Sequence, residues 1–288
     1  MNVRPRRTML RSAMAALALL AANDIALAQP SDSRLKRIQD TKTVKIAYRS
    51  DSKPFSFLNE QGEPAGYTVD VCKLVASSLQ QQLNVQVAIA WVPVTTKDRF
   101  SVISGGAADM ECGSSTVTLG RMQELDFSSF TFVENTALAV KASSGIRALN
   151  ELEGRKIAVI AGTTNEAALA RELQRRHLSA TVVRVVNREE GMAVLDEGKV
   201  DAFASDRFLL LGSRGDAKLT MLPEDLSVEP YAIALPRGDW AFRLAVNKAL
   251  AQIFRSEILD IFTKWFGSAG ARPSLLIGAV YVLGALPD

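Results

Sequence analysis

The sequence predicts an α/β protein made of two lobes that are joined by two extended crossings. Strand-like runs alternate with helical segments of about 10 to 15 residues, a pattern typical of parallel α/β sheets. The alternation occurs on both sides of a long extended run at 126–141, and a second extended run follows at 230–235. The chain has 288 residues, which is long enough for two lobes with a core in each.

The first lobe is expected to begin with apolar–polar alternation, which is the mark of a half-buried strand. Its first helix is predicted because Val71, Leu74, Val75 and Leu79 recur at helical spacing. The expected elements are a strand over 44–48, a helix over 68–83, a strand over 85–92, a short helix over 95–104 that starts with Thr95-x-x-Asp98, and a strand over 108–112.

The second lobe follows the first extended run and repeats the same alternation. Its elements are a short helix ending over 149–154, a strand over 156–160, a helix over 165–177, a strand over 181–186, a helix over 189–197 stopped by Gly198, and a strand over 202–205. Helices over 240–254 and 257–266 close the chain after the second crossing. We therefore expect residues 29–133 and 234–288 in lobe 1 and residues 134–233 in lobe 2.

Residues 1–28 read as an export signal. Four arginines between Arg4 and Arg11 precede the apolar run Ala13–Ala22, and Ala26-Leu27-Ala28 forms a small-x-small cleavage site. The apolar run is too short for the roughly 20 residues that span a bilayer. The alternative is an N-terminal helix of the folded protein. The segment predicts a periplasmic protein and leaves open general or twin-arginine export, to which Arg6-Arg7 would be suited.

The net charge of +3 belongs to this segment and not to the rest of the chain. The chain has 34 Lys+Arg and 31 Asp+Glu. Without the four arginines and the one aspartate of residues 1–28, 30 basic and 30 acidic residues remain. A balanced chain lacks the basic surplus of nucleic-acid-binding proteins, and we expect no nucleic-acid partner.

The two cysteines, Cys72 and Cys112, both lie in the exported part. In an oxidising compartment an even pair is most simply a disulfide. Two buried free thiols are the alternative. The loop between them has about 40 residues, for which the chain-entropy relation gives about 4 kcal/mol.

Catalytic and metal-binding patterns are missing from the sequence. His177 is the only histidine and lies in a charged stretch, which excludes a two-histidine metal site and a plausible Ser-His-Asp triad. Neither a GxxxxGK[ST] loop nor a GxGxxG loop occurs. We therefore expect no metal, no cofactor and no enzymatic activity.

Arginines in polar turns after the predicted strands are the best candidates for ligand contacts. Arg49 follows the first strand, Arg99 lies in the turn after the strand over 85–92, and Arg121 follows Gly113-Ser114-Ser115-Thr116. Ligands of open α/β sheets bind beyond the carboxyl ends of the strands. The planar guanidinium suits a carboxylate, because it donates two parallel hydrogen bonds. For each arginine taken alone, a solvated surface charge is the alternative.

Gly162-Thr163-Thr164-Asn165-Glu166 follows a strand and opens a helix. Thr163-x-x-Glu166 fits a capping box, and the free amides of a first helical turn favour an anion. The motif is equally consistent with a helix cap that holds no ligand.

Taken together, these residues resemble the periplasmic solute-binding proteins of amino-acid ABC transporters, family 3, and particularly the glutamate/aspartate type. The resemblance covers essentially all of the chain after residue 28. It rests on the order and spacing of Lys53-Pro54-Phe55-Ser56-Phe57, Gly66-Tyr67-Thr68-Val69-Asp70-Val71-Cys72, Glu111-Cys112-Gly113-Ser114, Leu125-Asp126-Phe127-Ser128, Gly162-Thr163-Thr164 and Lys264-Trp265-Phe266.

The resemblance implies a type II clamshell that closes on an amino acid and passes it to a membrane permease. It also implies a role for each contact residue. Arg121, Ser114 and Thr116 would hold the α-carboxylate, with Thr163 and Thr164 at the helix start; Asp206 would pair with the ammonium; Arg49, Arg99 and Thr96 would contact the side-chain carboxylate; and Phe55 would pack on the aliphatic part. We expect a monomer.

Two departures from the family pattern leave the exact ligand open. Val117-Thr118-Leu119-Gly120 replaces the usual residues before Arg121, and Arg188 stands where this type usually has histidine. Arg188 keeps the charge but is larger, so the acid could be shorter or placed differently. Glutamate, aspartate, glutamine and related ligands stay open, as do affinity, stereoselectivity and the cognate permease.

Two other functions are consistent with the same scaffold. The first is a periplasmic dehydratase acting on a cyclic dicarboxylate, for which Glu111, Glu166 or Glu189 would have to serve as general acid. The second is a ligand sensor that signals to a receptor. Neither is supported by a recognisable catalytic motif or a signalling segment.

Overall fold

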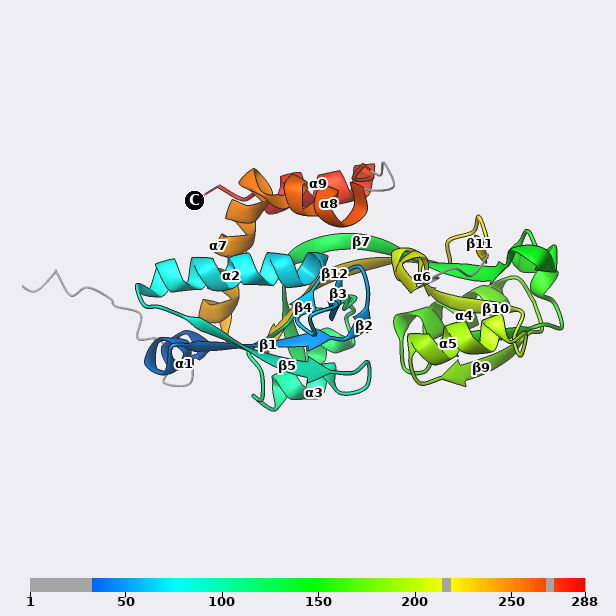
Figure 1. Cartoon of the computed structure of the whole chain (residues 1–288), viewed down its shortest axis with the longest axis horizontal. Helices are drawn as coiled ribbons and strands as arrows, with labels where there is room; N and C mark the ends of the chain where they lie inside the picture. The colour runs from blue at the N-terminus through cyan, green and yellow to red at the C-terminus, as the bar shows by residue number, and fades with distance from the viewer. Residues whose placement is uncertain (1–32, 214–218, 268–271, 288) are drawn as a thin grey trace, which may run out of the picture.

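The computed structural model describes residues 33–213, 219–267 and 272–287. The predicted export signal at 1–28 lies outside the described residues. Figure 1 shows two groups of elements joined by two long strands, β7 (Leu125–Lys141) and β12 (Ser227–Pro236). These strands are the two extended crossings expected from the sequence, and each is longer than the run that predicted it. The residues at which each lobe ends stay a prediction.

The first lobe is built around a sheet whose central strand follows the first helix. Its other elements are α1 (Arg34–Thr41), β1 (Thr43–Arg49), β2 (Asp51–Ser52), β3 (Ser56–Leu58), β4 (Pro64–Ala65), α2 (Tyr67–Leu83), β5 (Ala88–Val94), α3 (Arg99–Ser104), β6 (Met110–Glu111) and the 3₁₀ turn η1 (Arg121–Gln123), with α7 (Trp240–Ser256), α8 (Ile258–Phe266) and α9 (Leu275–Gly284) at the end of the chain.

The second lobe lies between the two crossings. Its elements are the 3₁₀ turns η2 (Ala142–Ser144) and η3 (Leu149–Leu152), then β8 (Lys156–Ile160), α4 (Thr164–Arg175), β9 (Thr181–Val185), α5 (Arg188–Asp196), β10 (Ala202–Asp206), α6 (Arg207–Ser213) and β11 (Leu219–Met221).

One hydrogen-bonded sheet runs through both lobes in the order β5-β1-β6-β12-β7-β10-β8-β9, and β11 also pairs with β7. In this sheet β1 pairs in parallel with β5 and β6, and β8 with β9 and β10. A separate three-stranded sheet of the first lobe, β2-β3-β4, is antiparallel. Pairs that involve β7 or β12 are antiparallel. The sheet is therefore mixed, because the two crossings insert between the parallel groups.

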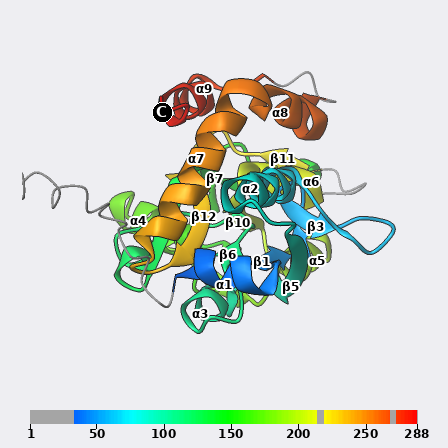
Figure 2. The same ribbon diagram turned by 90° about the vertical axis from the view of Figure 1, so that its left-hand side faces the viewer.

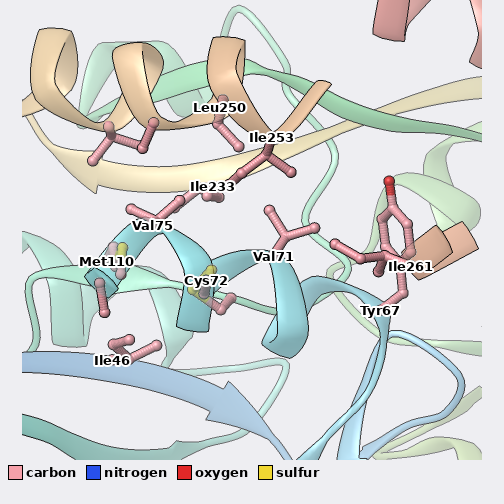
Figure 3. Close-up of a cluster of buried hydrophobic side chains, with 14 of the residues drawn as sticks. Ile46, Tyr67, Val71, Cys72, Val75, Met110, Ile233, Leu250, Ile253 and Ile261 are labelled. Atoms are coloured by element: carbon pink, nitrogen blue, oxygen red, sulfur yellow. A yellow bond between two sulfur atoms is a disulfide. The ribbon is translucent and has the colours of Figure 1, made fainter. Parts of the chain in front are cut away.

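Each lobe has its own core on both faces of the sheet. In β7, Leu138 and Val140 join the cluster under α4, whereas Ala137 and Ala139 join the cluster on the opposite face. This separation follows from the two-residue period of a strand. In the first lobe, Figure 3 shows Val71, Cys72 and Val75 of α2 between residues of the sheet below and α7 above.

The closing helices pack on the first lobe. α7 contacts both α2 and β7, and α9 contacts α7 and β7. Figures 1 and 2 show α8 and α9 together at one end of α7. α9 buries Ile277 and Tyr281 and leaves Leu275, Val282 and Leu283 exposed. In the described part of the chain, no helix combines the length and apolar character needed to cross a bilayer.

The disulfide predicted between Cys72 and Cys112 is present. It joins α2 to the loop that follows β6, with Cα atoms 6.3 Å apart. The bond therefore fixes the position from which Gly113 and Ser114 continue toward the strand ends.

Candidate ligand-binding site

A cavity lies between the two lobes, beyond the ends of their strands. Arg49 is the last residue of β1 and Asp206 is the last residue of β10. Arg188 begins α5, directly beyond β9. Residues at the carboxyl ends of parallel strands meet at one edge of a sheet, which is the usual ligand position in such folds.

The cavity brings together ten of the eleven predicted contact residues. From the first lobe they are Arg49, Thr96, Arg99, Ser114, Thr116 and Arg121, and from the second lobe Thr163, Thr164, Arg188 and Asp206. Ile160 and Asn165 complete the lining.

Phe55 is the predicted contact that the structure does not bring to the cavity. Its side chain is fully buried in the core of the first lobe. Its ring centroid lies 4.9 Å from that of Phe132 and 5.3 Å from that of Tyr231, with steeply inclined ring planes. Aromatic rings in this arrangement stabilise one another. In this structure Phe55 is a core residue of the first lobe.

Arg99 and Arg121 share one aromatic platform. Their guanidinium carbons lie 4.4 Å and 4.8 Å from the ring centroid of Phe100. Arg99 Nε donates to Ser115 Oγ at 3.0 Å, and Arg121 Nη1 donates to the carbonyl oxygen of Thr116 at 2.6 Å. Burial lowers the pKa of Arg99 to about 10 and also lowers the pKa of Arg121. Both arginines remain protonated at neutral pH, although burying a charge away from water costs free energy unless the charge is paired.

Arg49 and Arg188 share an anchor on the first lobe. Arg49 Nη2 donates to the Asp51 carboxylate at 2.6 Å, and Arg188 Nη1 donates to the Asp51 carbonyl oxygen at 2.7 Å. The second bond joins the two lobes. Both arginines are buried. The pKa of Arg188 is lowered, mainly by burial and also by the positive charge of Arg49. Asp51 opposes this lowering.

The start of α4 forms the capping arrangement that the sequence predicts. Thr163 Oγ1 accepts from the amide of Glu166 at 3.2 Å. The Glu166 carboxylate accepts from the amide of Gly162 at 2.8 Å, one residue before the expected partner. Thr163, Thr164 and Asn165 line the cavity, so the positive end of the helix is directed toward it.

A hydrogen-bond network connects Asp206 to both crossing strands. Asn165 Nδ2 donates to Asp206 Oδ1 at 3.0 Å and to Thr136 Oγ1 at 2.7 Å. Thr136 Oγ1 in turn donates to Glu229 Oε1 at 3.2 Å, and Thr116 Oγ1 donates to Glu229 Oε2 at 2.7 Å. The network therefore spans β7, β12 and both lobes.

Sequence reasoning missed Asn165 and Glu229. Asn165 sits inside the quoted helix-start motif, next to two residues that were assigned to the ligand. Glu229 precedes the extended run predicted at 230–235, and no sequence pattern shows that it is buried in β12.

Two carboxyl groups near the cavity hold protons more tightly than usual. Burial, and then the charge of Glu229, raise the pKa of Asp206 to about 6. Burial, and then the charge of Asp206, raise the pKa of Glu134 to about 8. Glu134 and Glu229 face each other directly in the pairing of β7 with β12. At neutral pH Asp206 is therefore mostly ionised, while Glu134 is mostly protonated.

The three carboxyl groups considered as general acids lie outside the cavity lining, although Glu111 is beside Arg99, Arg49 and Arg121, whose charges oppose the rise in its pKa. Glu111 is fully buried, and burial raises its pKa. Glu166 pairs with Arg184 at 2.5 Å and caps α4, and Glu189 is exposed. None of the three lines the cavity. Within residues 33–213, 219–267 and 272–287, no cluster of three or more metal-ligating side chains is found.

Known proteins resemble this chain in sequence. The family model of the bacterial extracellular solute-binding proteins, family 3, matches residues 44–268. The L-glutamate/L-aspartate-binding protein of Pseudomonas aeruginosa is 31% identical over 242 residues, which cover 81% of this chain and 79% of that protein. The glutamate/aspartate import solute-binding protein of Escherichia coli is 28% identical over 267 residues, covering 88% and 87%.

Solved structures agree with this relationship. An ancestral arginine-binding protein bound to glutamine superimposes with a TM-score of 0.70 at 27% identity, covering 78% of this chain and 98% of that one. An ancestral amino acid-binding protein described as a precursor of cyclohexadienyl dehydratase gives 0.72 at 26% identity, covering 81% and 100%. With a family match over most of its length and this two-lobed fold, the chain belongs to the bacterial extracellular solute-binding proteins, family 3.

Proposed function

We propose that this protein binds an acidic amino acid, glutamate, aspartate or a close analogue, between its lobes and delivers it to the permease of an ABC transporter. The observation that carries the proposal is the charge of the cavity. Four arginines and one aspartate line it. An acidic amino acid offers two carboxylates, which suit the arginines, and one ammonium, which suits the aspartate, so it complements the sign of every charge in the cavity.

Each of the ten predicted contact residues that line the cavity receives a role in this proposal. Arg121, Ser114, Thr116 and the start of α4 at Thr163 and Thr164 hold the α-carboxylate. Asp206 accepts from the ammonium. Arg49, Arg99 and Arg188 surround the side-chain acid together with Thr96. A Kd near 1 μM corresponds to about 8 kcal/mol, which a few charge-assisted hydrogen bonds can supply.

The names of the relatives support the same ligand class. The Pseudomonas aeruginosa and Escherichia coli proteins are named for glutamate and aspartate. The family as a whole consists of extracellular solute-binding proteins. We therefore propose that this chain works in the periplasm, directed there by the signal at 1–28. We also propose that it is a monomer, and the balanced charge after residue 28 supports the absence of a nucleic-acid partner.

Closure around the ligand would be a hinge motion of the two crossings. We place lobe 1 at 29–133 and 234–288 and lobe 2 at 134–233, so that β7 and β12 both pass between the lobes. The Arg188–Asp51 contact joins the lobes directly. A ligand that bridges Arg121 and Asp206 with Arg49 and Arg99 binds the closed state better than the open one, and so favours it.

A dehydratase is the second candidate, because one similar structure is that of a precursor of cyclohexadienyl dehydratase. The positions of Glu111, Glu166 and Glu189 outside the cavity lining weigh against it. We propose a protein that binds its ligand without turnover. Product analysis after incubation with a cyclic dicarboxylate would distinguish the two functions.

The proposal is tested by a thermal-shift screen of the mature protein against the twenty common amino acids. We expect the melting temperature to rise with aspartate, glutamate or both, because ligand binding to the native state stabilises it by mass action. Neutral amino acids should produce smaller shifts. A melting temperature that none of the twenty ligands changes would refute the proposal.

A further inference from the structure

Glu111 is a buried carboxyl group that the proposed function does not use. It ends β6 in the middle of the sheet, where β6 pairs with β1 on one side and with β12 on the other. Its side chain is fully buried, and neither carboxyl oxygen has a hydrogen-bond partner among the described residues. Buried polar groups are almost always paired, so an unpaired one requires a specific explanation.

The sheet places Glu111 on the same side as Arg49. Ala47 of β1 is the register partner of Glu111, and Arg49 follows Ala47 by two residues. Side chains two residues apart in a strand point to the same face of the sheet. Gly113 agrees with this placement, because a Cβ there would lie 2.1 Å from Glu111 Oε1 and 3.1 Å from Arg49 Cγ. Only glycine leaves room for the carboxyl group at this point.

Three of the four cavity arginines act on Glu111. Burial raises the pKa of its carboxyl group, and the charges of Arg99, Arg49 and Arg121 oppose this rise. The effect is mutual for Arg99, whose pKa is lowered by burial, because Glu111 opposes this lowering more than any other charge. The three arginines line the cavity and Glu111 does not. In the proposed function Arg99 and Arg49 contact the side-chain acid of the ligand, so Glu111 lies behind the groups that bind this acid.

A carboxylate in this position has two consequences. It offsets the mutual repulsion of the buried arginines, which would otherwise have to be kept close together without an anion. It also repels a second carboxylate that approaches the same guanidinium groups from the cavity, because like charges interact strongly where water is excluded. A neutral amide group in the same place is not repelled in this way. Glu111 therefore weakens the binding of an acidic side chain more than that of an amide.

We infer that Glu111 is a specificity-determining residue of this site, and that its buried negative charge limits how strongly the cavity prefers an acidic side chain to a neutral one. The inference rests on the proposed function and adds to it a residue that does not contact the ligand. Glu111 acts through Arg99 and Arg49, whose charges it shares with the acid group of the ligand.

The test is isothermal titration of the mature protein and of Glu111→Gln with L-aspartate and L-asparagine at neutral pH. The two ligands share the α-carboxylate and the ammonium, so the ratio of their dissociation constants isolates the side-chain charge. We expect the preference for aspartate to rise at least about fivefold in Glu111→Gln, because the substitution keeps the shape and removes a charge that acts through a low dielectric. Glu111→Asp retains the charge and should keep the ratio of the wild type. If glutamate is the more tightly bound acid, L-glutamate and L-glutamine replace this pair.

Glu172→Gln is the matched control, because Glu172 is a glutamate that pairs with Arg175 and Arg176 outside the cavity lining. It should leave the ratio unchanged. A thermal melt of each variant verifies that it is folded, and Glu111→Met, which is also neutral, replaces Glu111→Gln if the latter is not. An unchanged or smaller preference for the acid in the neutral variant would overturn the inference while leaving the proposed function intact. Failure of the wild type to bind either aspartate or glutamate would overturn the proposed function and the inference with it.

Discussion

The cavity between the lobes and the hinge beside it are both buried and charged, but their charges have opposite signs and different partners. The cavity is dominated by arginines, and two of these keep an unused donor among the described residues. The hinge has two directly paired glutamates, Glu134 and Glu229. Glu134 accepts from the amides of Asn135 at 2.8 Å and Phe208 at 3.2 Å, while Glu229 accepts from threonine hydroxyls.

The difference is that the protein itself supplies hydrogen-bond partners for the charged groups of the hinge but not for all of those in the cavity. The hinge acids obtain their donors from the protein and, in the case of Glu134, from a retained proton. In the cavity, Arg49 Nε and Arg188 Nε have no acceptor among the described residues, and an anionic ligand would supply one. Asp206 belongs to both regions, because it lines the cavity and bonds to the network that reaches Glu229. In the proposed function it is therefore the residue that would connect the ammonium of the ligand to the acidic hinge.

Removing Arg121 from the cavity should cause the largest loss of ligand affinity. Loss of one partner from a buried, hydrogen-bonded charge pair costs about 2 to 5 kcal/mol. We expect Arg121→Ala to weaken aspartate and glutamate by at least about 30-fold, and to weaken asparagine or glutamine as well, since all of them carry the α-carboxylate. Isothermal titration measures each dissociation constant.

Arg99→Ala is the matched variant on the same Phe100 platform. It should weaken mainly the acidic ligands, because Arg99 is assigned to the side-chain acid. Equal losses for acidic and neutral ligands in Arg99→Ala would contradict this division of roles.

Asp206→Asn tests the acid at which the two regions meet. The amide keeps the shape but loses the charge that attracts the ammonium, and we expect a loss of about 2 kcal/mol, or about 30-fold in Kd. Asp201→Asn, an exposed aspartate that pairs with Arg155, should leave the affinity unchanged. A wild-type affinity in Asp206→Asn would remove Asp206 from the site.

The same residue predicts how binding depends on pH. The pKa of Asp206 is about 6 in the protein without ligand. Below pH 6 this carboxyl group is mostly protonated, and it must lose that proton before it can pair with the ammonium of a ligand. Affinity should fall about tenfold between pH 7.5 and pH 5. This change should be much smaller in Asp206→Asn, and an equal change in both proteins would assign it to another group.

Glu134→Gln tests the acidic hinge through the pH dependence of the free energy of unfolding. The pKa of Glu134 is raised to about 8 in the folded protein, so its stabilising proton is fully retained below the unfolded pKa and lost as pH rises through 8. The free energy of unfolding of the wild type should therefore decline between about pH 4.5 and pH 8 relative to that of Glu134→Gln. Urea unfolding at pH 5, 7 and 9 gives this difference, and parallel curves would contradict it.

Gly212→Val tests closure and has the smallest expected effect. A Cβ at Gly212 in α6 would lie 2.4 Å from the carbonyl oxygen of Lys53 in the first lobe, too close for backbone to accommodate without moving the lobes apart. We expect about a tenfold loss of affinity, equivalent to about 1.4 kcal/mol. Gly278→Val, in a helix with no atom within 4 Å of the added Cβ, should bind normally. Normal binding by Gly212→Val would mean that the lobes need not approach this closely.

Most of the fold follows from local sequence patterns. The short apolar run over 157–160 and the helical spacing of Val71, Val75 and Leu79 correspond directly to β8 and α2. The small sheet of β2, β3 and β4 could not be predicted, because strands of two or three residues are too short to show a period. α6 was also missed, since it is short and packs through Phe208 on Phe132 and Phe266, which are distant in the sequence.

The site was predictable to the extent that its residues stand at strand ends. Arg49 and Asp206 could be found in this way, because each ends a strand whose pattern is clear. Phe55 shows the limit. A phenylalanine in a polar turn is consistent with a ligand contact or with a core residue, and only the three-dimensional neighbours of Phe55 distinguish the two. Asn165 likewise turns inward because Thr136 and Asp206 come near it from other strands.

The most direct test of the central claim, that the cavity recognises two carboxylates and one ammonium together, is one titration series with L-aspartate, L-asparagine and succinate. Asparagine lacks the second carboxylate and succinate lacks the ammonium. We predict that aspartate binds at least about 30-fold more tightly than either, since each analogue leaves a buried charge without its partner. Equal affinity for aspartate and for either analogue would contradict the account.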